Sequence, residues 1–412
     1  MTYNETLEYL YNSTPVFERV GASAYKEGLA NTIALDDHFG NPHRSFKTIH
    51  VAGTNGKGST SHTLAALLQC AGYRVGLYTS PHLIDFSERI RVNGEPVEHD
   101  FVVDFVAEHK EFFEPLHPSF FELTTAMAFK YFKEQQVDIA VIEVGLGGRL
   151  DCTNIISPLL TVITNISFDH TGFLGDTLAK IAAEKAGIMK KNVPCVVGEY
   201  VEETLPVFEN KAKEMGAKLI LAQDVDYELP EFQLKGACQS RNARTIMAAC
   251  KELIGMGIVP DDDAIIAEAF AHVCDITHLR GRWEVLSEKP LVVCDTGHNV
   301  AGWEYLAPQI KQQKCNRRHI VFGMVDDKDI ETVMDMLPKD AVYYFCQAST
   351  HRAIPVERVA EIAKAHGLHG SQHDNVKDAY GEAIKNAAPD DFVFIGGSSY
   401  VVADLLSTIP LA

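Results

Sequence analysis

The sequence has little positive charge for its length. Its 412 residues contain 37 Lys and Arg against 56 Asp and Glu, which gives a formal net charge of −19 at pH 7. Extended binding to nucleic acid requires a basic face that displaces counterions, so this excess of acidic residues argues against it. A small anionic substrate stays compatible with the charge, provided that local cations or metal ions receive it.

Long apolar runs are also missing, and the cysteines show no pairing pattern. No stretch is apolar enough to cross a bilayer, and residues 1–20 lack the basic start and apolar core of a signal peptide. The nine cysteines are scattered, odd in number and never spaced C-x-x-C, which favours reduced thiols over a disulfide frame or a zinc site. We therefore expect a cytoplasmic protein that engages no membrane.

What the sequence does contain is an alternation of short apolar runs with longer amphipathic ones. Helical patterns separate several of these runs, for example residues 59–72. Buried β-rich runs that alternate with helices predict an α/β fold with a mostly parallel sheet. In the first part of the chain the runs expected to be strands are 47–53, 73–80, 137–145, 159–166, 193–199 and 218–224.

The alternation restarts after residue 290, and the chain is too long for one ordinary hydrophobic core. The second series of expected strands is 291–299, 319–325, 341–347 and 391–397. We therefore predict a larger nucleotide-type domain over residues 1–284 and a smaller, Rossmann-like α/β domain over residues 285–412, joined by a short hinge.

The most informative stretch is GTNGKGST, residues 53–60, between an expected strand and an expected helix. It departs from the usual phosphate loop, because Gly58 separates Lys57 from Ser59. One interpretation is a simple tight turn with a solvated Lys57. The strand, glycine turn and helix together favour an anion site, in which backbone N–H groups and the helix N-terminus receive phosphate and a lysine reaches its outer oxygens.

Glu143 lies inside the apolar run VIEVG, where a carboxylate is costly unless it is paired or bound to metal. It either provides a hard oxygen ligand for a magnesium-nucleotide site or lies at an exposed strand end and pairs with Arg149. Other polar residues lie where strand ends present ligands in such sheets. They are Ser80, His82, Asp169, His170, Asp295, His298 and Asn299. By default, Lys185 would be a surface lysine, and the histidines at 38, 43 and 50 would have no special role.

Taken together, these segments resemble the folylpolyglutamate synthase/dihydrofolate synthase family of the Mur ligase superfamily over nearly the whole chain. The resemblance is carried by GTNGKGS, TSPHL, EVGLGGRLDCTN, AAEKAGI, QSRNA, RGRWE, DTGHN and GMVDDKD, which occur in the family's order. It implies a Mur-ligase-like ATP-binding domain followed by a C-terminal glutamate-ligase domain. The opening loop would then be the family's own form of the ATP loop.

The resemblance also implies roles for individual residues. The catalytic set would be Lys57, Glu143, His170, Lys185 and His298. ATP would contact Asn55, Gly56, Lys57, Gly58, Ser59, Asn242, Arg282 and Asp295. Two magnesium sites would draw on Ser59, Ser80, Glu143, His170 and Lys185, the last as a carbamylated N6-carboxylysine. The folate or pteroate would lie by Pro81, His82, Phe121, Glu122, Leu150, Asp151 and Cys152, and the glutamate side would use His298 and Ser398.

The implied reaction joins a carboxylate to an amine in folate biosynthesis and one-carbon metabolism. ATP would phosphorylate dihydropteroate or a folate, and the amino group of L-glutamate would attack the acyl phosphate, with release of ADP and phosphate. The expected partners are these small molecules, and the expected state is a monomer.

Three alternatives remain open at this point. One is a Mur-type ligase that acts on another carboxylate acceptor, the second is a non-catalytic nucleotide-binding relative, and the third is a loop-based kinase. Departures from the family pattern at Thr296, Cys238 and Ser399 bear on specificity rather than on the reaction class. The residues alone do not decide between dihydrofolate synthesis, polyglutamate extension and both.

Overall fold

A computed structural model describes residues 1–14, 28–326 and 328–409. The chain divides into two compact units. The first comprises residues 1–233 and 240–278, and the second comprises residues 234–239 and 279–412. The chain therefore crosses between units three times, and the predicted boundary after residue 284 falls inside a strand, β9 (Glu284–Glu288). No helix in the described ranges has the length and apolar character needed to cross a membrane.

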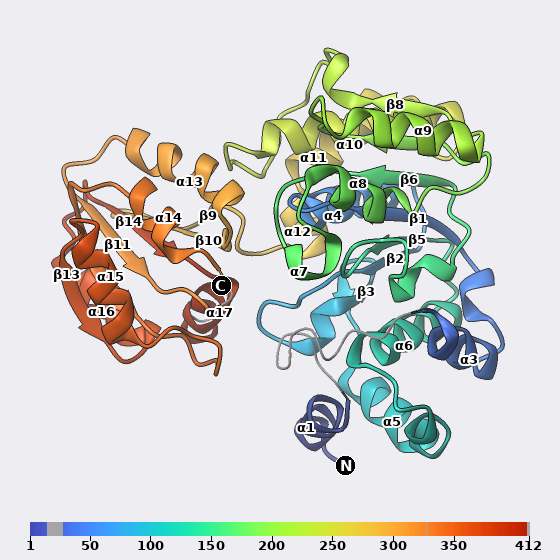
Figure 1. Cartoon of the computed structure of the whole chain (residues 1–412), viewed down its shortest axis with the longest axis horizontal. Helices are drawn as coiled ribbons and strands as arrows, with labels where there is room; N and C mark the ends of the chain where they lie inside the picture. Colours follow the sequence, from blue (N-terminus) through green and yellow to red (C-terminus); the bar gives the residue numbers. More distant parts are fainter. Residues whose placement is uncertain (15–27, 327, 410–412) are drawn as a thin grey trace. The chain divides into compact units, whose positions relative to one another are not determined.

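The first unit is built on an eight-stranded sheet in the order β4-β3-β2-β5-β1-β6-β7-β8. All neighbouring pairs are parallel except β2–β3 and β3–β4, which are antiparallel. The mostly parallel sheet predicted from the apolar runs is thus confirmed (Figure 1). The strands are β1 (Lys47–Ala52), β2 (Val75–Tyr78), β3 (Ile90–Val92), β4 (Glu95–Pro96), β5 (Ile139–Glu143), β6 (Leu160–Ile163), β7 (Cys195–Val197) and β8 (Leu219–Leu221).

Helices cover this sheet because its central strands are apolar on both faces. Every residue of β5 is buried, as expected for a parallel strand between two helical layers. The helices of the first unit are α1 (Tyr3–Ser13), α3 (Ala30–His38), α4 (Lys57–Cys70), α5 (His99–Phe113), α6 (Phe120–Glu134), α7 (Thr171–Leu174), α8 (Leu178–Ala186), α9 (Leu205–Met215), α10 (Gln239–Gly255), α11 (Asp263–Ala271) and α12 (Val273–Thr277).

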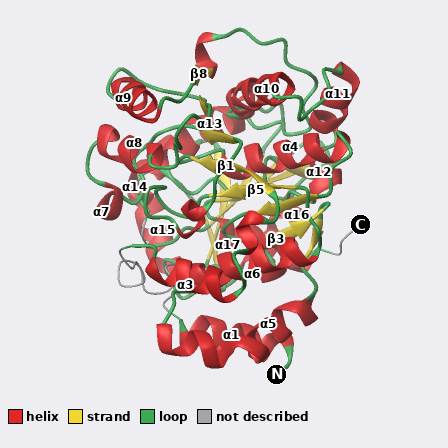
Figure 2. Ribbon diagram, turned by 90° about the vertical axis from the view of Figure 1, so that its right-hand side faces the viewer, coloured by secondary structure: helices red, strands yellow, loops and turns green. Residues whose placement is uncertain are grey.

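Two of these helical layers matter for the site. On one face, α4 packs against β5, β2 and β1 and is itself covered by α11 and α12. On the other, the core around α5 and α6 includes Tyr78, Ala140 and Ile142. The N-terminal helix α1 packs on α5, and the two lie side by side in both views (Figures 1 and 2).

The second unit has a six-stranded sheet in the order β13-β12-β11-β14-β10-β9, in which β9 alone is antiparallel to its neighbour. The strands after β9 are β10 (Leu291–Asp295), β11 (Arg318–Phe322), β12 (Ala341–Cys346), β13 (Gly370–His373) and β14 (Phe392–Gly396). Its helices are α13 (Val300–Gln312), α14 (Ile330–Met336), α15 (Val356–Ala365), α16 (Val376–Asn386) and α17 (Ser399–Thr408). The smaller α/β unit predicted for the C-terminal part is present.

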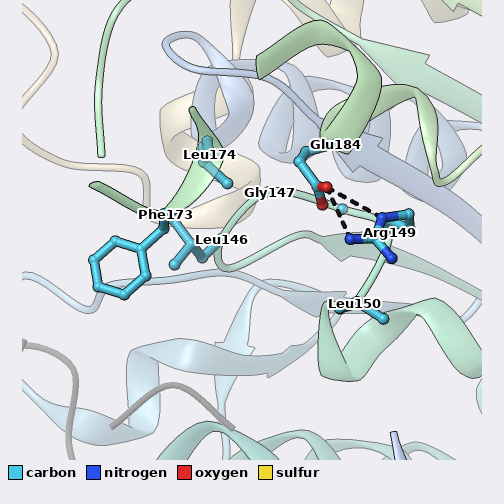
Figure 3. Close-up of a pocket in the computed structure, with 8 residues that line it drawn as sticks. Leu146, Gly147, Arg149, Leu150, Phe173, Leu174 and Glu184 are labelled. Atoms are coloured by element: carbon cyan, nitrogen blue, oxygen red, sulfur yellow. Dashed lines mark hydrogen bonds and ion pairs between the residues drawn. The ribbon is translucent and has the colours of Figure 1, made fainter. Parts of the chain in front are cut away.

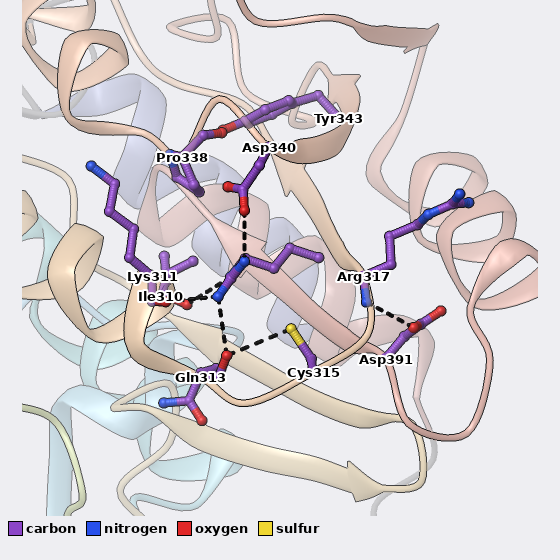
Figure 4. Close-up of polar contacts among 10 residues, drawn as sticks. Ile310, Lys311, Gln313, Cys315, Arg317, Pro338, Asp340, Tyr343 and Asp391 are labelled. Atoms are coloured by element: carbon purple, nitrogen blue, oxygen red, sulfur yellow. Dashed lines mark hydrogen bonds and ion pairs between the residues drawn. The ribbon is translucent and has the colours of Figure 1, made fainter.

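A single arginine closes one end of α13. The Arg318 side chain donates hydrogen bonds to the backbone oxygens of Ile310, Lys311 and Gln313 and pairs with Asp340. These four partners are labelled in Figure 4. The last carbonyls of a helix have no partners within it, so a cation here satisfies them and complements the helix dipole. The return from α13 to β11 is thereby fixed.

The segment 234–239 belongs to the second unit through contacts with α13. Ala237 N–H donates to Gln309 Oε1 at 2.6 Å, and Gln309 Nε2 donates to the Lys235 carbonyl at 3.2 Å. The sequence pattern predicted one short connection near residue 285 and did not predict that residues 234–239 belong to the second unit.

Candidate active site

Four neighbouring strands end at one edge of the first sheet, and the predicted polar residues follow those ends. The strands lie in the order β2, β5, β1, β6. The pairings Tyr78 with Ile142, Val51 with Glu143, and Ala52 with Ile163 align their last residues. Ser80, Glu143, the glycine loop and His170 therefore all lie on the carboxyl-end side of the sheet, where doubly wound folds bind ligands.

The glycine loop leads directly into α4, whose N-terminus has no side-chain cap. Gly56, the residue before the helix, has φ +82°, a left-handed conformation that favours glycine. A Cβ on Gly56 would lie 2.3 Å from Asn242 Oδ1, and one on Gly53 (φ +146°) would lie 1.8 Å from Thr164 Oγ1. The glycines are thus required by close packing, and the first N–H groups of α4 can face an anion.

The segment after β6 holds the loop in place. Asn165 accepts from Thr54 N–H through its carbonyl and from Asn55 N–H through its side chain, at 3.0 and 2.9 Å. Thr164 Oγ1 donates to the Asn55 carbonyl at 2.6 Å. Sequence reasoning did not select Thr164 and Asn165, although their place at the end of an expected strand was a usable signal.

Two lysines converge on one carbonyl of the loop. Lys57 Nζ donates to the carbonyls of Gly53 and Thr54, each at 3.1 Å, and Lys185 Nζ donates to the same Gly53 carbonyl at 2.9 Å. The interpretation of Lys57 as a merely solvated side chain is therefore wrong. Lys185 is only 4 % exposed, so the default expectation of a surface lysine is wrong as well.

Burial, and after it the nearby charge of Lys57, lower the pKa of Lys185 to about 7. Half of the Lys185 amines are then uncharged near neutral pH. A neutral amine is a nucleophile, whereas an ammonium ion is not.

Replacing Lys185 with methionine should change how stability depends on pH. The unfolded lysine titrates near 10.5 and the folded one near 7. Between those values the unfolded state binds more protons at Lys185, so the contribution of this residue to stability rises with pH by at most ~1.4 kcal/mol per unit. Below pH 7 both states are protonated, and the cost of burying the ammonium is constant and largest.

We expect Lys185→Met to be more stable than the wild type at pH 6.5 and to lose that advantage by pH 9.5. Urea denaturation in CO2-free buffer measures it, with the exposed Lys133→Met as the matched control. Parallel pH profiles for Lys185→Met and the wild type would contradict the expectation.

Glu143 is the last residue of β5 and only 3 % exposed. The interpretation that places it at an exposed strand end is therefore wrong. Arg149, the partner suggested for it, pairs with Glu184 of α8 at 2.9 Å. The residue before Glu143, Ile142, belongs to the core around α5 and α6. Because side chains alternate along a strand, Glu143 faces the α4 side of the sheet, where Ser59 lies buried in the first turn of that helix.

His170 and Asp169 are adjacent at the start of α7. The His170 N–H donates to Asp169 Oδ1 at 2.9 Å, and His170 itself has φ +49°. In the described ranges, no group of three or more His, Cys, Asp and Glu side chains lies together as a metal site. The predicted magnesium set contains two such residues, Glu143 and His170, and depends on hydroxyl oxygens, Lys185 and substrate oxygens for the rest.

The turn that follows Glu143 borders a pocket of about 100 Å³ (Figure 3). Leu146 and Leu150 lie on the turn side, Phe173 and Leu174 come from α7, and the Arg149–Glu184 pair lies between the turn and α8. Gly148 and Gly187 allow this close approach, since a Cβ on Gly187 would lie 2.4 Å from Arg149 Cβ. Leu150 was expected to lie by the folate, whereas no sequence pattern predicted this pocket.

The residues expected to contact the folate differ in how far they are buried and bonded within the protein. Pro81 is exposed, and His82 Nδ1 accepts from Arg89 Nε at 2.7 Å. Phe121 stacks on Tyr78 and lies against Gly145. Glu122, by contrast, is 3 % exposed and caps α6 by accepting from Ser119 N–H.

Asp151 and Cys152 lie at the start of a short 3₁₀ helix, η5 (Cys152–Ile155). Asp151 is 5 % exposed, and its carboxylate accepts from the N–H groups of Gly145, Leu146 and Thr153. Burial raises the pKa of Asp151, and these hydrogen bonds oppose the rise. Its side chain is thus already engaged within the protein.

The second unit contains Arg282, Asp295, His298 and Ser398. Asp295 accepts from the N–H groups of Trp283 and Gly297 at 2.7 and 2.8 Å; burial raises its pKa, and the charge of Arg282 opposes that rise. His298 Nδ1 is 3.1 Å from the Thr296 carbonyl. Ser398 is buried and caps α17 through Val401 N–H, so its hydroxyl already serves a structural role.

The matching family models describe Mur ligase domains, and similar curated proteins are named folylpolyglutamate or dihydrofolate synthases. Residues 51–224 match the Mur ligase middle domain, and residues 281–399 match the Mur ligase glutamate ligase domain. The chain is 31 % identical to the folylpolyglutamate synthase of Lacticaseibacillus casei, over 99 % of both chains. It is 33 % identical to the dihydrofolate synthase/folylpolyglutamate synthase of Bacillus subtilis, over 92 % of this chain and 94 % of the relative.

Solved structures show the same likeness. The Escherichia coli FolC structure in complex with DHPP and ADP has a TM-score of 0.85 at 31 % identity and covers 99 % of this chain and 97 % of its own. A Yersinia pestis bifunctional folylpolyglutamate synthase/dihydrofolate synthase complexed with AMPPNP and Mn ion has a TM-score of 0.83 at 29 % identity. The match covers 99 % of this chain and 98 % of the Yersinia pestis chain. The chain spans half the length of one relative, a probable folylpolyglutamate synthase/dihydropteroate synthase of Haloferax volcanii, at 32 % identity.

Proposed function

Because the chain belongs to the folylpolyglutamate synthase/dihydrofolate synthase family of Mur ligases, we propose that it is an ATP-dependent ligase that adds L-glutamate to folates. The observation that carries this proposal is the uncapped glycine loop, on which Lys57 and the buried Lys185 converge at one carbonyl. A phosphate loop beside a buried carboxylate suits the activation of an acid by ATP.

The reaction proceeds in two steps. The acceptor carboxylate attacks the γ-phosphorus of ATP, the bond to ADP breaks, and an acyl phosphate forms. The neutral amino group of glutamate then attacks the acyl carbon, phosphate leaves with the bonding electron pair, and the nitrogen loses a proton. In this scheme Asn55, Gly56, Gly58 and Ser59 orient the phosphates, and Lys57 offsets the charge that shifts during transfer.

The donor set fits a divalent cation, the class of ion in the Yersinia pestis relative. Glu143 supplies a buried carboxylate at a strand end, Ser59 and Ser80 supply hydroxyls, and His170 an imidazole. Hard oxygen donors completed by phosphate oxygens and water are what Mg²⁺ prefers. A bound Mg²⁺ would neutralise phosphate charge; two sites are proposed on Ser59, Ser80, Glu143, His170 and Lys185.

Lys185 is proposed to carry a carbamate. Its neutral amine attacks the carbon of CO2, an N–C bond forms and one proton leaves the nitrogen, so a buried cation becomes an anion able to bind metal. The pKa of about 7 supports this step, because it leaves much of the amine uncharged at neutral pH.

We expect activity to rise several-fold when bicarbonate is added to CO2-free enzyme, and Lys185→Met to lack the response. Native mass spectrometry should show one added CO2 on the wild type only. A wild type with unchanged mass and unchanged rate would remove the carbamate from the mechanism.

On the acceptor side, the proposal places the folate by Pro81, His82, Phe121 and the turn from Leu150 to Cys152. Arg89 Nε can only donate, so its hydrogen bond holds His82 Nδ1 as an acceptor and leaves the ring proton on Nε2. Glu122 and Asp151 would shape this region through backbone hydrogen bonds. In the second unit, Arg282 and Asp295 are assigned to ATP, and His298 and Ser398 to the glutamate side.

A monomeric state and a cytoplasmic location belong to the same proposal. The nine cysteines, all within the described ranges, form no disulfide bond, which is compatible with a reducing compartment. Size-exclusion chromatography with light scattering tests the first point.

A coupled ADP-release assay tests the function. It contains ATP, Mg²⁺ and glutamate and is run separately with dihydropteroate and with tetrahydrofolate. We expect turnover with both acceptors. Turnover with one acceptor would assign a single activity, and silence with both, in protein shown to bind ATP, would favour another Mur-type acceptor or a non-catalytic role.

A further inference from the structure

A buried hydrogen-bond chain links the loop-bearing strand to the turn after Glu143. His50 lies on β1, three residues before Gly53, and its Nε2 is 2.8 Å from Thr153 Oγ1. Thr153 Oγ1 in turn bonds Asp151 Oδ1, and Asp151 Oδ2 accepts from Gly145 and Leu146 N–H at 3.0 and 2.9 Å. All three side chains are at most 5 % exposed.

The chemistry of the groups fixes the direction of this chain. The Asp151 carboxylate accepts from the N–H groups of Gly145, Leu146 and Thr153, and a carboxylate oxygen is an acceptor, so the Thr153 hydroxyl donates to it. The Thr153 oxygen can then accept from His50, which places the His50 proton on Nε2. Burial lowers the pKa of His50 to about 3, so the ring is neutral.

Burying His50 costs free energy that burying an apolar residue at this position would not. Its Nδ1 is buried and has no hydrogen-bond partner among the described residues. Its neighbours on β1, Ile49 and Val51, are apolar and fully buried, and a third such residue would fit a strand covered on both faces. A buried polar group with one unsatisfied nitrogen points to a role for its other nitrogen.

We propose that His50 and Thr153 are positioning residues that act through Asp151 to hold the turn Gly145–Leu146, and with it Glu143, in place for the metal ion. The turn begins two residues after Glu143, and its two N–H groups are fixed by one carboxylate oxygen. The other oxygen of the Asp151 carboxylate accepts from the Thr153 hydroxyl, which is hydrogen-bonded to His50 on β1, the strand that leads into the glycine loop. This inference rests on the proposed metal role of Glu143.

The test variants remove hydrogen bonds of this chain and keep side-chain volume nearly unchanged. They are Thr153→Val and His50→Leu, with Thr153→Ser and His50→Gln as conservative variants that retain the hydroxyl and the donor. The leucine variant of His50 deletes one bond, and the valine variant of Thr153 deletes both bonds of its hydroxyl. The primary readout is Mn²⁺ binding in the presence of ADP, measured by electron paramagnetic resonance. It needs no turnover, so a failed ligase assay leaves it interpretable and the two proposals can fail separately.

We expect Thr153→Val and His50→Leu to weaken Mn²⁺ binding at least fivefold, and Thr153→Ser and His50→Gln to restore it to within twofold. In the ligase assay, the Mg²⁺ concentration for half-maximal rate should rise by the same factor. Because the residues act in series, the double variant should bind Mn²⁺ no more weakly than Thr153→Val alone.

The chain offers a matched control in the same unit. His62 Nδ1 is also 2.8 Å from a buried threonine hydroxyl, that of Thr277 in α12. Thr277→Val should lower thermal stability to a similar degree yet leave Mn²⁺ affinity unchanged. The proposal is overturned if Thr277→Val weakens Mn²⁺ binding equally, if only the KM for folate rises, or if the serine and glutamine variants fail to restore binding.

Discussion

Replacing Lys57 with alanine is expected to lower kcat by roughly 10²- to 10³-fold, the usual effect of deleting one charged or hydrogen-bonding group that stabilises a transition state. Lys57 Nζ is held over the loop by the Gly53 and Thr54 carbonyls. Phosphate oxygens can take over those contacts as charge moves from the γ-phosphate. The ADP-release assay at saturating glutamate and folate measures the effect.

Lys133→Ala is the matched control. Its Nζ also donates to two backbone carbonyls, those of Phe39 and Gly40, but it is exposed and lies on α6. We expect its kcat to stay within twofold of the wild type. Near-normal turnover in Lys57→Ala would remove the glycine loop from the ATP site.

Replacing Glu143 with alanine is expected to lower kcat by about as much as the Lys57 variant does. It should also remove the saturable dependence of the rate on Mg²⁺. Glu143 is the buried carboxylate at the edge where β2, β5, β1 and β6 end. Without it, the proposed ligand set would contain no carboxylate side chain, and its remaining acidic group would be a carbamate on Lys185. A Mg²⁺ titration of the rate, from micromolar to tens of millimolar, measures the change.

Asp36→Asn controls for the loss of any buried carboxylate in this unit. Asp36 is 4 % exposed and pairs with His43 at 2.7 Å, and nothing places it in the active site. Its variant should keep the wild-type Mg²⁺ response. If Glu143→Ala also keeps that response and its rate, Glu143 does not bind the metal.

The strands could be predicted because their signal is local. An apolar run such as IAVIE has one physical solution in an α/β protein, a central strand covered on both faces. The strands that were missed, β3, β4, β9 and β13, are short or polar. β13 has the sequence Gly-Ser-Gln-His and lies at a sheet edge, where little apolar surface is needed.

The site residues could be selected by motif, but their environments could not. Nothing near Lys185 in the sequence predicts that its amine reaches Gly53, 132 residues away. The same applies to His50, which was expected to have no special role and whose partner Thr153 is 103 residues distant. Burial and pKa depend on such long-range packing.

The order of strands in the first sheet has a consequence for how the chain is made. β1 emerges early, but its two neighbours are β5 and β6, which end at Glu143 and Ile163. At about 5–20 residues per second, the ribosome needs roughly 5 to 20 seconds to deliver both. Until β5 is made, β1, which is buried at every position but its first, has both edges open, and one edge stays open until β6 follows. The glycine loop therefore acquires its neighbouring strands only after β6 has been made, and the nascent chain must avoid wrong strand pairing until then.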